Sequence, residues 1–232
     1  MSLETYDSLD KLYLARQGEV SACRPLLTGD VIDDVAIPGV DGRGLAIIIA
    51  HPCQMRGKRA SLKARVLAAR VHAHAPVDRT AWMTGFYDRM PLPELMGDSD
   101  LYVGDFSALG LVDSQELADG PRVACLMPFG INMLQQRLVK HMTRLEVETF
   151  RLHEACASAF DEADLLEEFC ETVTSGGMDL VEAAALFDAF IRADRKGGTY
   201  QDALRDPQLR PQVRIACRTE ARRICGGAPT AD

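Results

Sequence analysis

Apolar residues recur along this chain with two spacings, one typical of strands up to about residue 126 and one typical of helices beyond it. The strand-like segments are short, rich in β-branched residues and bounded by glycine, proline and aspartate, which favour turns. They are residues 31–37, 45–50, 64–71, 101–106 and 122–126. The second is apolar throughout, which predicts a strand buried on both faces. The third also fits a helix that begins at Ser61.

Helical spacing appears near the start of the chain and again in its C-terminal part. Residues 3–18 predict a short amphipathic helix, and apolar side chains one turn apart predict a longer helix over 128–145. Further helices are predicted over residues 155–173, from an N-cap at Asp179 to residue 193, and after Pro211.

This order of elements predicts an α+β protein with a small SH3-like β-barrel and an α-helical C-terminal extension. Closing the sheet into a barrel would remove the exposed edges that so short a sheet otherwise presents. The predicted division is a helical lead-in over 1–26, a barrel with its terminal helix over 27–145, a helical extension over 146–226 and a disordered tail over 227–232.

Composition indicates an ordinary globular protein, with 47% apolar and 26% charged residues. The chain lacks an uncharged apolar run of the roughly 18 residues that a membrane span needs, and its acidic N-terminus does not resemble a signal peptide. We therefore expect a cytoplasmic protein of bacterial type, without a membrane partner. The seven cysteines are odd in number and lack a C-x-x-C pair, so we interpret most of them as small buried hydrophobes.

Charge is unevenly distributed along the chain, although the net charge is −8. The run from Gly42 to Val77 holds no acidic residue and seven basic ones, which are Arg43, Arg56, Lys58, Arg59, Lys63, Arg65 and Arg70. This run is either an anion-binding surface or a solvated pair of strands. In the C-terminal part, Arg214, Arg218 and Arg222 recur every four residues, and we expect them to pair with the acidic helix over 155–173.

Three short motifs occur in the strand-like part of the chain: Thr28-Gly-Asp-Val-Ile32, Gly42-Arg-Gly-Leu-Ala-Ile-Ile-Ile-Ala-His51 and Ala75-Pro76-Val77. Together they resemble motifs of the MazF/PemK-like toxins. The resemblance covers about residues 27–145 and implies the barrel fold, a homodimer and cleavage of RNA without a metal. It also implies that Arg43, at the start of the second strand, stabilises the phosphate. At the family's hydroxyl position stands Asp78, and Thr80 is the nearest hydroxyl that could serve.

Further residues of this region are candidates for binding RNA. Arg56, Lys58, Arg59 and Lys63 carry charges that could hold a phosphate backbone, and Trp82 could stack on an unpaired base. The alternative for Trp82 is a plug in the barrel core.

Two pairs of metal-ligand residues also occur at i and i+2, the spacing that places side chains on one face of a strand. They are His51 with Cys53 and His72 with His74. If the second and third strands are neighbours, these four side chains could converge on zinc; otherwise no cofactor is expected. A nucleophilic Cys53 with a histidine partner is a further alternative.

Two functional hypotheses follow. The first is a non-catalytic or degenerate MazF-like interaction module that binds nucleic acid or a protein partner through the basic surface. The second is a metal-independent endoribonuclease of the toxin–antitoxin type that uses Arg43. Asp78 in place of a hydroxyl residue favours the first, because a carboxylate would repel the phosphate.

Overall fold

The computed structural model describes residues 2–56 and 62–226 in two compact units. The sheet unit comprises Met1–Val20 and Leu26–Cys156, and the helical unit comprises Ser21–Pro25 and Ala157–Asp232. The predicted disordered tail, 227–232, lies outside the described residues.

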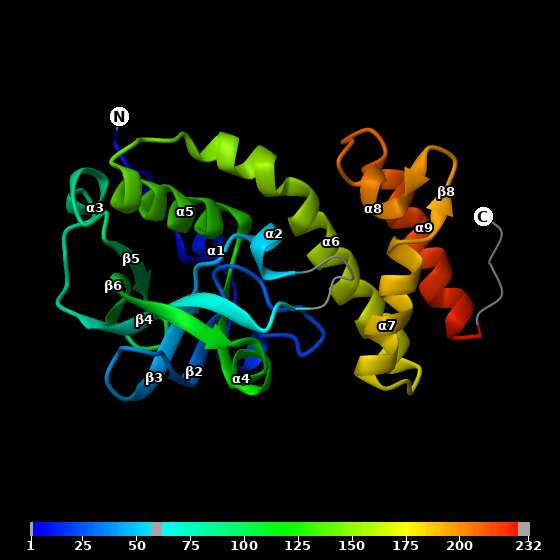
Figure 1. Ribbon diagram of the computed structural model, residues 1–232, viewed down its shortest axis with the longest axis horizontal. Coiled ribbons are helices and arrows are strands. Elements are labelled where there is room, and N and C mark those ends of the chain that lie inside the picture. Colours follow the sequence, from blue (N-terminus) through cyan, green and yellow to red (C-terminus); the bar gives the residue numbers. More distant parts are fainter. Residues whose placement is uncertain (1, 57–61, 227–232) are drawn as a thin grey trace. The chain divides into compact units, whose positions relative to one another are not determined.

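The sheet unit is built on seven antiparallel strands, ordered β1-β7-β2-β3-β4-β6-β5 (Figure 1). Their bounds are β1 Tyr13–Arg16, β2 Val31–Ala36, β3 Arg43–Ile48, β4 Arg65–His74, β5 Arg89–Pro93, β6 Leu101–Asp113 and β7 Arg122–Leu126. The helices of this unit are α1 Leu9–Leu12, the 3₁₀ helix η1 Gln17–Glu19, α2 Pro52–Met55, α3 Ala81–Thr84, α4 Ser114–Asp119 and α5 Pro128–Thr143.

The sheet is open, so the predicted SH3-like closed barrel is wrong, whereas the α+β class is correct. Strands β1 and β5 are the two ends of the strand order. Pro91 and Pro93 in β5 lack the N–H groups that a ladder to another strand would need. A side chain reaches this edge instead, since the Tyr13 hydroxyl donates to the carbonyl of Pro93 at 3.0 Å. The prolines thus disfavour main-chain pairing of another strand with the β5 edge, whereas the predicted barrel required such pairing there.

Two further sequence predictions concern the strands. The apolar run at 45–50 is confirmed as a buried strand, because Ala46, Ile47 and Ile48 are fully buried within β3. Residues 65–74 form β4 rather than the competing helix. The helix predicted over 3–18 is wrong: only the four-residue α1 is α-helical there, η1 begins at Gln17, and β1 between them pairs with β7. Pairing with a distant strand decided this segment, which local periodicity cannot reveal.

The helical unit is built around α6 Thr149–Ser175, which begins in the sheet unit, together with α7 Leu180–Ile191 and α9 Arg210–Ile224. The strands β8 Asp194–Arg195 and β9 Gly198–Thr199 and the short helix α8 Tyr200–Ala203 connect α7 to α9. Asp179 caps α7 as predicted, since its carboxylate accepts from the backbone N–H of Val181 at 2.8 Å.

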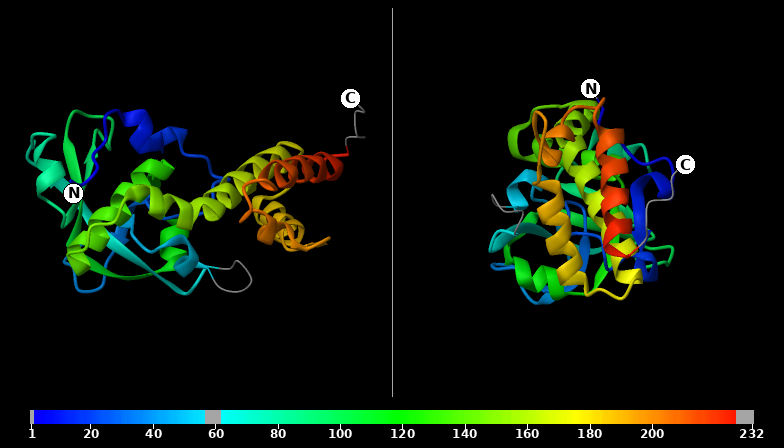
Figure 2. Two further views of the ribbon diagram at one scale, coloured as in Figure 1. Left: turned by 90° about the horizontal axis from the view of Figure 1, so that it is seen from above. Right: turned by 90° about the vertical axis from the view of Figure 1, so that its right-hand side faces the viewer.

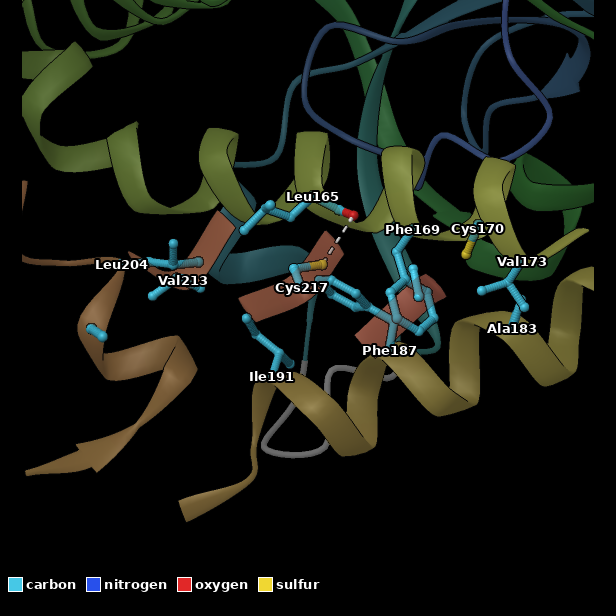
Figure 3. Close-up of a cluster of buried hydrophobic side chains, with 12 residues drawn as sticks. Leu165, Phe169, Cys170, Val173, Ala183, Phe187, Ile191, Leu204, Val213 and Cys217 are labelled. Atoms are coloured by element: carbon cyan, nitrogen blue, oxygen red, sulfur yellow. Dashed lines mark hydrogen bonds between the residues drawn. The ribbon is translucent and has the colours of Figure 1, made fainter. Parts of the chain in front are cut away.

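A single apolar cluster holds these helices together (Figure 3). Phe169 of α6 packs edge-on against Phe187 of α7, with ring centroids 5.6 Å apart. Helix α9 runs alongside α6 (Figure 2), and Cys217 donates to the Leu165 carbonyl. The predicted pairing of charges is confirmed for Arg214 and Arg218, which bind carboxylates of α6.

A buried cation joins α5 to three other parts of the sheet unit. The Arg137 guanidinium is fully buried and donates to the carbonyls of Trp82 at 2.8 Å, Glu4 at 3.1 Å and Phe86 at 3.3 Å. Burial lowers its pKa to about 10, so the side chain remains charged at neutral pH. Arg137 thereby connects α5 to the N-terminal segment, to α3 and to the turn that precedes β5.

Replacing Arg137 by methionine preserves the side-chain length but removes its hydrogen bonds to the three carbonyls, including the buried bond to Trp82. We expect the free energy of unfolding to fall by about 3 kcal/mol, measured by urea denaturation. Arg79→Met is the matched control, because Arg79 is exposed. An equal loss in the two variants would contradict the structural role of Arg137.

Candidate thiol–imidazole site

A histidine and a cysteine meet where β3 ends and α2 begins. His51 is the N-cap of α2 and Pro52 follows at its first position, a residue favoured there because its ring fixes the backbone angle. The His51 ring folds back over the turn and accepts a hydrogen bond at Nδ1 from the backbone N–H of Cys53, at 3.3 Å. The Cys53 thiol is exposed, and its Sγ lies 2.8 Å from the same Nδ1.

A second thiol approaches the other side of this ring. Cys156, in the first part of α6, is fully buried, and its Sγ lies 3.0 Å from His51 Nε2. The side-chain amide of Gln135, on α5, reaches the same sulfur, with both its oxygen and its nitrogen at 3.7 Å. One imidazole is therefore placed between an exposed thiol and a buried one.

The hydrogen bonds determine which ring nitrogen carries the proton. A backbone N–H can only donate, so the bond from Cys53 makes Nδ1 an acceptor. In the neutral ring the proton is then on Nε2, where it points to the sulfur of Cys156. The thiol of Cys156 can donate in turn to the Gln135 oxygen. In this tautomer the Nδ1 lone pair is shared between the backbone N–H and the thiol of Cys53.

Burial sets the charge states of the two inner groups. It lowers the pKa of His51, which keeps the ring neutral at neutral pH. It raises the pKa of the Cys156 thiol, although the hydrogen bond with Gln135 opposes this shift, so Cys156 remains protonated. A neutral imidazole beside an exposed thiol is the arrangement that general-base activation of a nucleophile requires.

The four predicted zinc ligands do not come together. Strands β3 and β4 are antiparallel with Ile48 opposite Ala68, so His51 lies near the beginning of β4. His72 is seven residues along β4 from Arg65, where β4 begins, which is ~23 Å at strand spacing, and His74 is further still. His72 contacts Asp105, and His74 contacts Arg89. Within 2–56 and 62–226, no three His, Cys, Asp or Glu side chains are placed to hold a metal ion.

The two predicted ribonuclease residues are engaged with different partners. Arg43 forms ion pairs with Asp34 at 2.8 Å and with Glu116 at 2.9 Å. The Thr80 hydroxyl donates to Asp78 at 2.5 Å. Both side chains are thus bound to carboxylates, and a phosphate would have to displace these carboxylates in order to bind.

The described residues among the predicted RNA contacts also have partners within the protein. Trp82 is fully buried and packs against Phe86, with ring centroids 4.9 Å apart, so it is the core residue of the alternative interpretation. Arg56 donates to the Leu26 carbonyl, and Lys63 donates to Gln54. Lys58 and Arg59 lie outside the described residues.

Sequence reasoning included His51 and Cys53 but missed Cys156 and Gln135. Most of the cysteines are predicted to be small buried hydrophobes, and nothing in the sequence around Cys156 distinguishes it from the other buried cysteines. It is 103 positions from Cys53 in the chain, so only the packing of α6 shows that the two belong to one site.

The lowered pKa of His51 predicts a pH dependence of stability. The unfolded chain binds a proton at this residue near the ordinary pKa of 6.5, whereas the folded chain binds it only at lower pH. The free energy of unfolding therefore falls as the pH drops from about 6.5 toward the pKa of the folded state. Urea midpoints at about pH 7 and about pH 5.5 should differ more in the wild type than in His51→Asn, whose side chain retains a cap for α2. An equal pH dependence in both proteins would contradict this assignment.

A scan against protein-family models found no match, and searches of curated proteins and of solved structures found none either. The resemblance to MazF/PemK-like toxins therefore stays a prediction. Over the described ranges, no helix combines the length and the apolar character needed to cross a bilayer.

Proposed function

We propose that this protein is a thiol-dependent enzyme of the acyl-transfer type, with Cys53 as its nucleophile and His51 as its general base. One observation carries the proposal: the unprotonated Nδ1 of His51 lies 2.8 Å from the sulfur of an exposed cysteine. That distance is short enough for direct proton transfer between the two groups.

The reaction proceeds in two balanced steps. Nδ1 of His51 accepts the thiol proton as the Cys53 sulfur attacks a carbonyl carbon, and a sulfur–carbon bond forms. The bond to the leaving group breaks, and the leaving group takes the proton from His51. Water or another acceptor then attacks the thioester with His51 again as the base, which restores the thiol.

The geometry distinguishes the roles of the two cysteines. A substrate can reach the exposed Cys53, whereas Cys156 is fully buried and its pKa is raised. Cys156 instead accepts the Nε2–H of His51, and Gln135 holds the thiol of Cys156. The two inner residues therefore position the ring, as the third member of a catalytic triad does.

The same contacts bear on the functions considered from the sequence. A toxin-type ribonuclease needs a free phosphate-binding arginine, but Arg43 is paired with two carboxylates. An interaction module that binds RNA or a protein through the basic surface, and a homodimer, remain predictions. The thiol–imidazole site has the more specific geometry, and we therefore favour it.

The central test is the rate at which Cys53 is alkylated by iodoacetamide, measured by peptide mass spectrometry at neutral pH. We expect His51→Asn to slow this reaction by about tenfold or more, because the asparagine still caps α2 but cannot accept the thiol proton. The exposed Cys225 is the internal control, and its rate should not change. Equal Cys53 rates in the two proteins would contradict the proposal.

The positioning role of Cys156 has a separate test. Cys156→Ala removes the acceptor for the Nε2–H, so the imidazolium is less stabilised and the pH of half-maximal Cys53 alkylation should rise. Cys156→Ser restores an acceptor in nearly the same place and should return the pH profile toward that of the wild type. If both variants kept the wild-type profile, Cys156 would only fill space.

A further inference from the structure

The basic run between Gly42 and Val77 separates into two groups in the structure. Three of its arginines are used within the sheet: Arg43 pairs with carboxylates, Arg70 donates to the carbonyls of Val35 and Gly42, and Arg65 lies opposite Asp113 in the β4–β6 ladder. The other two basic residues that the structure describes are Arg56 and Lys63. Arg56 is three residues after Cys53 in the chain, and Lys63 contacts the helix α2 that contains Cys53.

Main-chain and side-chain contacts bring Lys63 to the thiol site. Its backbone N–H donates to the carbonyl of Met55 at 2.8 Å, which places it beside α2. Its ammonium donates to the side-chain oxygen of Gln54 at 3.4 Å. Gln54 directly follows Cys53, and it is neutral, so this contact holds the ammonium on the residue next to Cys53 without cancelling its charge. Both Lys63 and Gln54 are exposed.

Acidic side chains are absent from the segment that supplies Cys53. The sequence from Gly42 to Val77 contains none. On α6, Glu154 is two residues before Cys156, about 200° around the helix, so it faces away from the buried thiol; it is also exposed. The neutral ring of His51 adds no charge. The segment around Cys53 is therefore positively charged.

We infer that the site takes an anionic electrophile, with Lys63 as its specificity-determining residue. The substrate would be an acyl compound that carries a carboxylate or phosphate near its reactive carbon. The ammonium attracts this negative charge, which raises the local concentration of the substrate at the thiol. This inference rests on the proposed function, since it assumes that Cys53 is the nucleophile.

Two alkylating agents that differ in charge test the inference on the full-length protein. Iodoacetate is anionic and iodoacetamide is neutral; with each, a sulfur–carbon bond forms at Cys53, iodide leaves, and His51 takes the thiol proton. At low salt, the ratio of the iodoacetate rate to the iodoacetamide rate should exceed that of 2-mercaptoethanol by about two- to threefold per positive charge. Salt of about 0.5 M should bring the two ratios together.

Variants assign the effect to Lys63. The rate ratio should fall about two- to threefold in Lys63→Gln and further in Lys63→Glu. Arg79→Gln is the matched control, since Arg79 is an exposed cation beyond the opposite end of β4, and its ratio should equal that of the wild type.

The outcomes separate this inference from the proposed function. An unchanged ratio in both Lys63 variants overturns the inference, even where iodoacetamide still reacts with Cys53 in a His51-dependent manner. Iodoacetamide rates that do not depend on His51 overturn the proposed function itself. A ratio that falls equally in Arg79→Gln also overturns the assignment to Lys63, because it would reflect the charge of the whole protein.

Discussion

The buried guanidinium of Arg137 fixes where helix α5 lies in the sheet unit. It donates to the carbonyls of Glu4, Trp82 and Phe86, three segments far apart in the sequence. Burying a cation without hydrogen-bond partners is costly, so the three carbonyls bound by its terminal nitrogens permit few other positions of the helix. The same helix carries Gln135, about half a turn before Arg137, and thereby sets where that amide meets the buried thiol of α6.

The thiol–imidazole site combines one local and one distant determinant. Locally, α2 begins at Pro52 shortly after the end of β3. His51 caps that helix by accepting a hydrogen bond from the backbone N–H of Cys53. This bond assigns the acceptor nitrogen of the ring. At a distance, α6 supplies Cys156 to the other nitrogen. The cap and the buried thiol favour the same tautomer, so each contact strengthens the arrangement that the other requires.

The distribution of charge on the sheet follows from the same architecture. Arg43 and Arg70 both bind groups of β2, which explains why arginines interrupt the apolar pattern of the sheet. Lys63 lies beyond this ladder, beside α2, and its contact is to the neutral Gln54. The resemblance to MazF/PemK-like toxins rests on the strand motifs, whereas the chemistry that we propose rests on the turn between β3 and α2.

The sequence by itself determined the features that depend on local chemistry. Turn residues and β-branched runs located β3, and the carboxylate of Asp179 located the start of α7. The pair His51 and Cys53 was visible because only Pro52 separates them in the chain. Only the tertiary structure decided whether the sheet closes, whether residues 13–16 form a strand, and that Cys156 completes the site. These features depend on pairing between segments far apart in the chain, and local periodicity contains no information about such partners.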